Sequence, residues 1–214
     1  MADRGTHWET AVATSTDGGE AWALVGGTIL SPTLGLSFER SEAGASILAT
    51  GAEWYYRASD ADAWAVVRTV GIGSRFQIAH LNGVWFGPAS DSYLPGLARS
   101  VDGETWFTQS NPSVLTSGYY RGFAYTNGTV IGQAYYDGVA GYTLDAGLTV
   151  QATAALPGFS GGYDVERPIV SQGGRTYMIG ASGEIYVITA VAATASAQAL
   201  PAPLGVPSCL AVRN

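Results

Sequence analysis

The chain has few residues of the types that perform catalysis, and their spacing gives them little chemistry to share. The two histidines, His7 and His80, lie in or beside expected strands, and with the single cysteine, Cys209, they form no zinc-binding spacing. Cys209 stands in an apolar Ser-Cys-Leu-Ala-Val run, which is typical of a buried thiol. No nucleophile elbow and no phosphate-binding loop occurs. We therefore expect no metal, no cofactor and no catalytic centre of these kinds.

Carboxylates and arginines leave one further route to catalysis, the hydrolysis of a glycosidic bond. Asp164 and Glu166 are two residues apart and Arg167 follows them, while Arg40 and Arg121 stand elsewhere in the sequence. A paired-carboxylate hydrolase holds two acids on opposite sides of a sugar, whereas acids two residues apart more often decorate one loop. We expect that the chain is not an enzyme, and a glycosidase-like activity stays as an alternative.

A turn that contains an aspartate recurs about every 42 residues. The copies read STDGGEAW from residue 15, ASDADAW from residue 58, SVDGETW from residue 100 and TLDAGLTV from residue 143. In a hairpin turn, an aspartate side chain accepts hydrogen bonds from the amides that follow it, and glycine supplies a positive φ. We therefore expect these aspartates to hold turns rather than to perform chemistry.

A second landmark precedes each of the three later copies of the turn and occurs once more after the last copy. Two short apolar runs flank a tight turn at Gly51, Gly83, Gly128 and Gly174, and Asn-Gly or Gly-Gly at such a turn is typical of a β-hairpin. Short strands that repeat every 40 to 50 residues indicate the blades of a β-propeller. We expect an all-β fold, a single five-bladed β-propeller over residues 1–214. The blade that contains Gly51 is expected to lack a strand, because Gly51 and Gly83 are only 32 residues apart.

The two ends of the chain are expected to share one blade. Residues 208–214 resemble the first strand of a blade, and residues 4–8 resemble the segment after the turn of that strand. Pairing of N- and C-terminal strands would remove an open sheet edge and close the ring.

The repeated turns resemble the Asp-box, Ser-x-Asp-x-Gly-x-Thr-Trp, of sialidases and many other β-propellers. The matching residues are Ser15, Asp17, Gly19 and Trp22; Asp60 and Trp64; Ser100, Asp102 and Trp106; and Thr143, Asp145 and Gly147, with Val150 in place of the last tryptophan. The resemblance implies a structural turn away from the active face, with the tryptophan packed into the seam between blades. It does not extend to sialidase activity, because the Arg-Ile-Pro motif of that family is missing before the first box.

The opposite face of the blades is the expected place for a ligand. The boxes and the Asn-Gly turns share one end of each blade, and the connections at the other end interleave tyrosines with charged residues. The candidate binding residues are Tyr93, Tyr119, Tyr120, Arg121, Tyr136, Asp137, Tyr163, Asp164 and Arg167. Exposed tyrosines with polar neighbours suit sugar rings or a protein surface. The alternative is that these tyrosines fill space where the connections cross the blades.

Charge and composition limit the possible partners. The net charge is −7 and the ten basic residues are all arginine, which suits no nucleic-acid partner. No 18-residue apolar run and no signal-peptide core occurs, so we expect neither membrane insertion nor a signal peptide.

The boxes with their upstream hairpins also resemble the propeller modules of bacteriophage structural proteins. That resemblance implies a virion structural or adhesion protein, in a phage tail or as capsid decoration. Its partners would be other virion proteins or a host-surface glycan. The alternative function is a free lectin-like carbohydrate-binding module, and the alternative location is the cytoplasm, or release by lysis.

Overall fold

The computed structural model is built from antiparallel β-sheets. Its described part holds strands β1 to β18, and no helix in that part has the length and apolarity to cross a membrane. The chain divides into two compact units, residues 1–75 and residues 76–214. The described residues are 9–15, 19–30, 36–50, 53–69, 78–89, 96–110, 120–134, 141–143, 145, 147–152, 169–180, 185–188 and 197–199.

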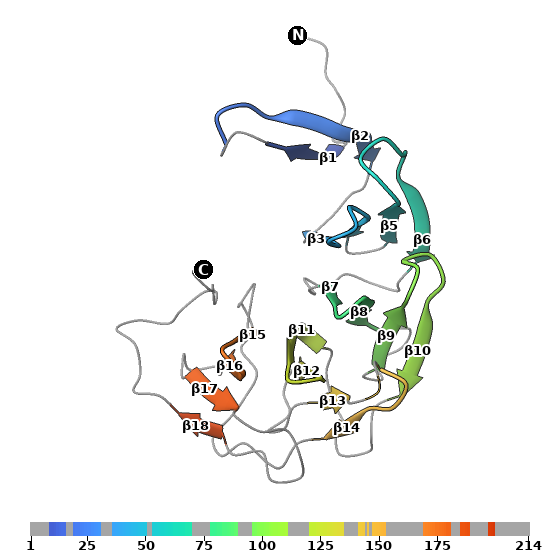
Figure 1. The fold of residues 1–214 in the computed structure, drawn as a ribbon. Coiled ribbons are helices and arrows are strands. Elements are labelled where there is room, and N and C mark those ends of the chain that lie inside the picture. The colour runs from blue at the N-terminus through green and yellow to red at the C-terminus, as the bar shows by residue number, and fades with distance from the viewer. Residues whose placement is uncertain are drawn as a thin grey trace. The chain divides into compact units, whose positions relative to one another are not determined.

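The first unit contains a two-stranded sheet and a four-stranded sheet (Figure 1). In both sheets each strand pairs with the next one in the chain. Leu48 and Tyr55, which pair across two neighbouring strands, are buried together, and Trp64 packs against them. Trp54, the partner of Ala49, is buried on the opposite face of the sheet. The strands are β1 (Glu9–Thr14), β2 (Ala23–Leu30), β3 (Leu36–Arg40), β4 (Ser46–Thr50), β5 (Glu53–Arg57) and β6 (Ala65–Thr69).

The second unit contains three four-stranded sheets, again with strands in chain order (Figure 1). The first sheet holds β7 (Ala79–Leu81), β8 (Val84–Pro88), β9 (Gly96–Ser100) and β10 (Phe107–Ser110). The second sheet holds β11 (Tyr120–Thr126), β12 (Thr129–Ala134), β13 (Gly141–Thr143) and β14 (Gln151–Ala152). The third sheet holds β15 (Ile169–Gln172), β16 (Arg175–Ile179), β17 (Ile185–Ile188) and β18 (Ala197–Ala199).

The three tight turns predicted in this unit are confirmed. Each joins the first and second strands of its sheet, and both of its central residues have positive φ, as in the type I′ turns that match the twist of a hairpin. The boxes from residues 100 and 143 join the third and fourth strands, so boxes and hairpin turns share one end of the sheet. The φ values are 51° and 78° for Asn82 and Gly83, 48° and 82° for Asn127 and Gly128, and 58° and 73° for Gly173 and Gly174.

The prediction of a missing strand beside Gly51 is wrong, because the sheet over residues 36–69 has all four strands. Gly51 lies between the second and third strands of this sheet, whereas Gly83 lies between the first and second strands of the next. The matching turn here is residues 41–45, with Gly44 at a φ of 95° and a 2.8 Å backbone hydrogen bond between its end residues. The interval of 32 residues between Gly51 and Gly83 is short because the two glycines belong to turns at different places in their sheets.

The blade that is predicted to be shared by the two ends of the chain is described only in part. β1 and β2 flank the box from residue 15 and so correspond to the third and fourth strands of a blade. The strands expected from residues 4–8 and 208–214 lie outside the described residues. Five blades and the closure of the ring stay predictions.

Two clusters of buried apolar side chains join the three sheets of the second unit. One lies between the sheets β7–β10 and β11–β14 and contains Ala79, Val84, Phe86, Leu97, Tyr120, Phe123 and Val130. The other lies between β11–β14 and β15–β18 and contains Ala124, Ile131, Tyr142, Ile169, Met178, Tyr186 and Ile188. The second seam also holds a buried hydrogen bond of 2.9 Å, donated by Nε2 of Gln133 to the carbonyl of Ile179.

Candidate functional site

The turn from Ser100 to Trp106 donates hydrogen bonds to its own aspartate. Oδ1 of Asp102 accepts hydrogen bonds from the amides of Glu104 and Thr105, at 2.9 and 2.7 Å, and from the Ser100 hydroxyl at 2.8 Å. The backbone amide of Thr105, followed by the Ser100 hydroxyl, lowers the pKa of Asp102 to about 2. Asp102 is therefore an ionised carboxylate that holds its turn.

The turn from residue 143 has the same construction with threonine in place of serine. Thr143 donates to Oδ1 of Asp145 at 2.6 Å, and Thr149 donates to the same carboxylate through its amide at 2.9 Å and its hydroxyl at 2.6 Å. Burial acts to raise the pKa of Asp145, but these hydrogen bonds outweigh it and lower the pKa to about 2. The amide of Gly147 donates to Thr143 Oγ1 at 2.9 Å, which completes the turn.

The residue at the end of the box is exposed in the first box and packed against a buried cluster in the box from residue 143. In the first box, the amide of Gly19 donates to Ser15 Oγ at 2.8 Å and the Trp22 indole donates to the Gly19 carbonyl at 3.0 Å, yet Trp22 is 66% exposed. Asp17 lies outside the described residues. Val150 packs against a buried cluster in the seam, as the box resemblance implies. The prediction of a seam position is wrong for Trp22, whose indole is held by its own turn instead.

The box from residue 58 departs from the other three. Its first position is Ala58, so the hydroxyl that meets the aspartate elsewhere is missing. Asp60 instead accepts two hydrogen bonds from Arg40, Nη1 to Oδ1 at 2.9 Å and Nη2 to Oδ2 at 2.8 Å. The hydrogen bonds from Arg40 lower the pKa of Asp60. Asp60 thus ties two strands together through an ion pair, whereas Ser59 and Asp62 hold the turn through a 2.7 Å hydrogen bond.

Arg57 lies beneath this pair with its side chain fully enclosed. Its Nη2 is 2.8 Å from Oδ1 of Asp60, but its nitrogens make no aligned hydrogen bond, so the contact is an ion pair alone. Its guanidinium carbon stands 4.6 Å from the ring centroid of Trp64, within the range of a cation–π contact. Burial lowers the pKa of Arg57, the charge of Asp60 raises it, and the charge of Arg40 lowers it again. The charged cluster, Arg40, Asp60, Arg57 and Trp64, is a new feature that the box resemblance did not predict.

The nine candidate binding residues fall mostly outside the described residues. Tyr120 is described in full, and its side chain is 2% exposed, with its ring centroid 5.4 Å from that of Phe123. The backbone of Arg121 lies in β11. The binding role of Arg121 and of the remaining seven stays a prediction, while Tyr120 packs inside the fold. Those seven are Tyr93, Tyr119, Tyr136, Asp137, Tyr163, Asp164 and Arg167.

The residues considered for glycosidase chemistry are not assembled in the described part of the chain. Arg40 is bound to Asp60, while Asp164, Glu166 and Arg167 lie outside the described residues. Among the described residues, no group of three or more histidine, cysteine, aspartate or glutamate side chains is arranged to hold a metal ion.

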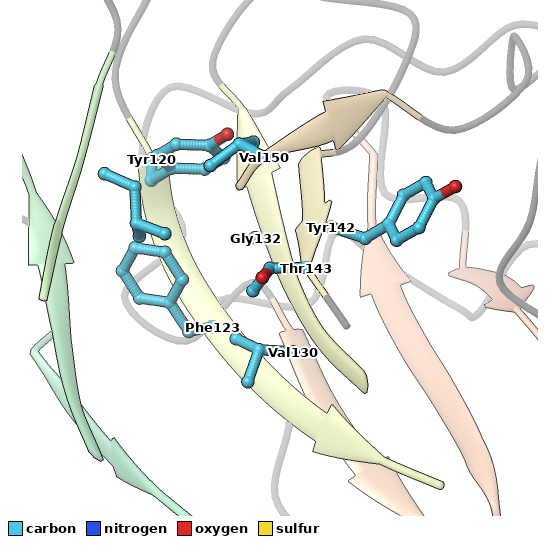
Figure 2. A pocket seen from close by; sticks show the side chains of 8 residues that line it. Tyr120, Phe123, Val130, Gly132, Tyr142, Thr143 and Val150 are labelled. Atoms are coloured by element: carbon cyan, nitrogen blue, oxygen red, sulfur yellow. The ribbon is translucent and has the colours of Figure 1, made fainter. Parts of the chain in front are cut away.

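A small cavity opens in the seam between the first two sheets of the second unit (Figure 2). Its volume is about 10 Å³, close to the space that one water molecule needs. Figure 2 shows the ring of Tyr120 beside Val150, while Tyr142 points away to the other side of β13. The cavity is a packing gap and is too small for an organic ligand.

Sequence reasoning missed a residue type that stands directly before two of the boxes. Arg57 and Arg99 each precede an aspartate by three residues and a tryptophan by seven. Like Arg57, Arg99 has a buried Nε without a hydrogen-bond partner. Its Cδ would lie 3.2 Å from a Cβ at Gly147, in the box of the next sheet. The shared spacing from the box is the signal that could have found both arginines.

Comparison with solved structures identifies the fold. The chain is similar to BamB from Moraxella catarrhalis, with a TM-score of 0.61 and 11% identity over 89% of this chain and 58% of that one. It is also similar to the crystal structure of a nidogen/laminin complex, with a TM-score of 0.57 and 11% identity over 83% of this chain and 67% of that one. It is similar, too, to YCF48 bound to a D1 peptide, with a TM-score of 0.53 and 12% identity over 83% of this chain and 58% of that one.

These similar structures are β-propeller proteins, so the fold is of the propeller type. At 11 to 12% identity the likeness concerns the fold alone. The chain spans between 58% and 67% of the length of these three proteins. No protein-family model and no curated protein sequence matches the chain.

Proposed function

We propose that the chain is a non-catalytic β-propeller that serves as a structural or adhesion protein of a virion, in a phage tail or as capsid decoration. The observation that supports the non-catalytic part of the proposal is the state of the repeated aspartates, whereas the virion role rests on the resemblance of the boxes and hairpins to propeller modules of bacteriophage structural proteins. Asp102 and Asp145 accept hydrogen bonds from the turns that contain them, and Asp60 is bound to Arg40. The recurring acids therefore support the scaffold and are not poised as general acids or bases.

Macromolecular partners also fit the fold. Two of the similar propellers are seen with a bound partner, nidogen with laminin and YCF48 with a D1 peptide. We extend that behaviour to this chain as part of the proposal, with other virion proteins or a host-surface glycan as the partner. The candidate contacts are the tyrosines of the connections, Tyr93, Tyr119, Tyr136 and Tyr163.

The decisive experiment is to locate the protein. Lysates of the source would be imaged by electron microscopy with a gold-labelled antibody raised against the chain. Label at discrete positions on phage particles, on the tail or on the shell, is the expected result. Label that stays off the particles would overturn the virion proposal, and pre-immune serum on the same lysate is the control.

The alternative is a free lectin-like module, and a glycan array tests it with the purified chain. Tyr136→Ala and Tyr163→Ala should then reduce binding to any glycan found, because both side chains belong to the candidate face. Trp22→Ala is the matched control, since Trp22 is an exposed aromatic residue at the box end of its sheet. Loss of binding in the control alone would place the glycan at the box end and remove the tyrosines as its ligands.

A further inference from the structure

Two of the hairpin turns carry an asparagine directly before a glycine. They are Asn82 and Gly83 between β7 and β8, and Asn127 and Gly128 between β11 and β12, and all four residues are exposed. Asparagine is prone to lose its side-chain amide before glycine, because a residue without a Cβ leaves its own backbone nitrogen uncrowded. A Cβ at either glycine would meet no atom within 4 Å, so the structure adds no crowding at either turn.

The loss of the amide needs only water as a reactant. The backbone nitrogen of the glycine gives up its proton and attacks Cγ of the asparagine. A bond forms between that nitrogen and Cγ, the bond from Cγ to Nδ2 breaks, and ammonia leaves. Water then opens the five-membered imide. Opening at Cγ gives aspartate, whereas opening at the main-chain carbonyl gives isoaspartate, in which the backbone runs through Cβ and Cγ.

A closed turn opposes the first step of this reaction. Asn82 and Asn127 have φ values of 51° and 48°, in the left-handed region where ψ is also positive. That conformation turns the nitrogen of the next residue away from the asparagine side chain, so the turn has to open before the attack. Because the two turns have nearly the same φ values, any difference in their rates comes from how readily each one opens.

The hairpin that holds Asn82 has fewer residue pairs to keep it closed. Among the described residues, β7 and β8 pair at three positions, from Ala79 with Phe86 to Leu81 with Val84. β11 and β12 pair at six positions. Local opening costs less where fewer backbone hydrogen bonds must break, so the turn at Asn82 opens more readily.

The side chain of Asn127 is also restrained, whereas that of Asn82 is not. Nδ2 of Asn127 donates a hydrogen bond of 3.4 Å to the carbonyl of Gly174, in the turn of the next sheet. A Cβ at Gly174 would lie 3.4 Å from the same nitrogen, so the amide lies against that turn. In the described part of the chain, the side chain of Asn82 makes no such hydrogen bond. The amide that has to leave is therefore held at Asn127 and is free to rotate at Asn82.

We propose that Asn82 is a site of spontaneous covalent modification, at which the imide forms and water converts it to aspartate and isoaspartate. Either product adds one negative charge to the chain. Aspartate keeps the turn, because Asp-Gly suits the same turn type as Asn-Gly. Isoaspartate lengthens the backbone by one atom, which a two-residue turn cannot absorb without a change in the pairing of its strands.

The strand after the turn transmits this change to the core. Val84 follows the turn directly, and together with Phe86 and Ala79 it belongs to the buried cluster between the sheets β7–β10 and β11–β14. Isoaspartate at position 82 therefore loosens this cluster, whereas aspartate does not. The inference goes beyond the proposed function, since it holds for any role of the chain.

The test compares the native chain with its unfolded form. The full chain is incubated at mildly alkaline pH, in buffer and in urea, and peptide mapping by mass spectrometry follows each asparagine. In buffer, Asn82 should be converted about tenfold faster than Asn127. In urea the two rates should be similar, because both residues precede glycine. Asn111 is the internal negative control, since the nitrogen of Pro112 has no proton to lose.

Hydrogen exchange measures the opening of the two turns independently. Val84 and Thr129 are the matching residues after the two turns, and the amide of Val84 should exchange faster. Equal conversion of Asn82 and Asn127 in the native chain, faster conversion of Asn127, or a difference that persists in urea would overturn the proposal. Equal exchange at the two amides would overturn it too, because the turns would then open alike.

Two variants separate the effects of aspartate and isoaspartate. Freshly prepared Asn82→Asp should melt at the same temperature as the unaltered chain, and Asn127→Asp is its matched control. Unaltered chain that has been incubated until it carries isoaspartate at position 82, detected with an isoaspartyl methyltransferase, should melt at a lower temperature. A fresh Asn82→Asp chain that melts as low as the incubated chain would show that charge, and not the lengthened backbone, weakens the fold.

Discussion

Asp60 places its Oδ1 2.8 Å from Nη2 of Arg57, whose side chain has no exposure to solvent. A buried guanidinium is costly unless a counter-charge lies beside it, and removal of one partner from such a pair leaves an uncompensated charge. Asp60 is itself 40% exposed at its side chain, so solvent screens part of the interaction.

Asp60→Asn should therefore lower the free energy of unfolding by about 1 to 3 kcal/mol, a figure below that of fully buried pairs because of this screening. Urea denaturation at neutral pH measures it. Asp62→Asn is the control, since Asp62 accepts a hydrogen bond from Ser59 that an amide oxygen can also accept. Arg57→Met should cost less than Asp60→Asn, because it removes the buried charge itself. A larger loss of stability for Arg57→Met than for Asp60→Asn would show that the burial of the Arg57 charge does not depend on Asp60.

The boxes predict a loss of stability in acid. The pKa of Asp102 and of Asp145 is about 2 in the fold and near 4 in an unfolded chain. Because the folded pKa is depressed, the stabilisation is complete above pH 4 and is lost as the pH falls from about 4 to about 2. Each aspartate should contribute about 1 kcal/mol after allowance for solvent screening.

Urea denaturation of the Asp102→Asn/Asp145→Asn double variant tests this dependence. The variant should be less stable than the unaltered chain at pH 6 and should lose less stability between pH 4 and pH 2.5. Parallel pH curves for the two proteins would mean that the box carboxylates do not gain stability from their turns.

Gly132 makes room for the ring of Tyr120. A Cβ at this position would lie 2.6 and 2.7 Å from two carbons of the ring, closer than real Cβ contacts come. Gly132→Ala should therefore lower the free energy of unfolding by about 1 to 3 kcal/mol through overpacking, as thermal or urea unfolding would measure.

Gly83→Ala is the comparison for this variant. A Cβ at Gly83 has no neighbour within 4 Å, so its cost comes from the positive φ of 78° alone and should be about 1 kcal/mol. Tyr120→Leu combined with Gly132→Ala should recover part of the loss, whereas additive losses would place the strain elsewhere.

The closure of the ring predicts a protected thiol. If residues 208–214 form a strand of the first blade, Cys209 should react with a thiol reagent far more slowly in the native chain than in urea. Deletion of residues 208–214 should lower the melting temperature by several degrees, since about 1 kcal/mol shifts it by 2 to 4 °C in a domain of this size. Fast labelling, together with an unchanged melting temperature after the deletion, would contradict closure by the tail.

Local turn chemistry made most of the fold predictable. Asn-Gly and the Ser/Thr-x-Asp spacing act within a few residues, so Asn82, Asn127, Asp102 and Asp145 could be placed without knowledge of the rest. Gly51 misled the count of strands because glycine also occurs between second and third strands, and the true counterpart at residues 41–45 has no Asn-Gly signature.

The charged cluster could not be predicted in the same way. Its members come from different strands, so their meeting depends on the register of β3, β4 and β5. Side chains along a strand alternate between the two faces of the sheet, so the burial of Arg57 can be predicted only when it is known which face is covered. Among the candidate binding residues, Tyr120 shows the same limit, since exposed and buried tyrosines look alike in sequence.

The box from residue 100 supplies hydrogen bonds to its own aspartate and accepts one from its own tryptophan. Asp102 finds its donors among residues 100 to 105, and the Trp106 indole donates to the carbonyl of Gly103. Such a turn can be copied, lost or altered in one blade without a matching change in the others. The sheet that begins at β3 is an example. Its box has Ala58 at the position of the serine and its aspartate, Asp60, binds Arg40, while the sheet keeps its four strands. A turn whose aspartate is bonded within it can thus differ from one sheet to the next while the hydrogen bonds within the other boxes stay as they are.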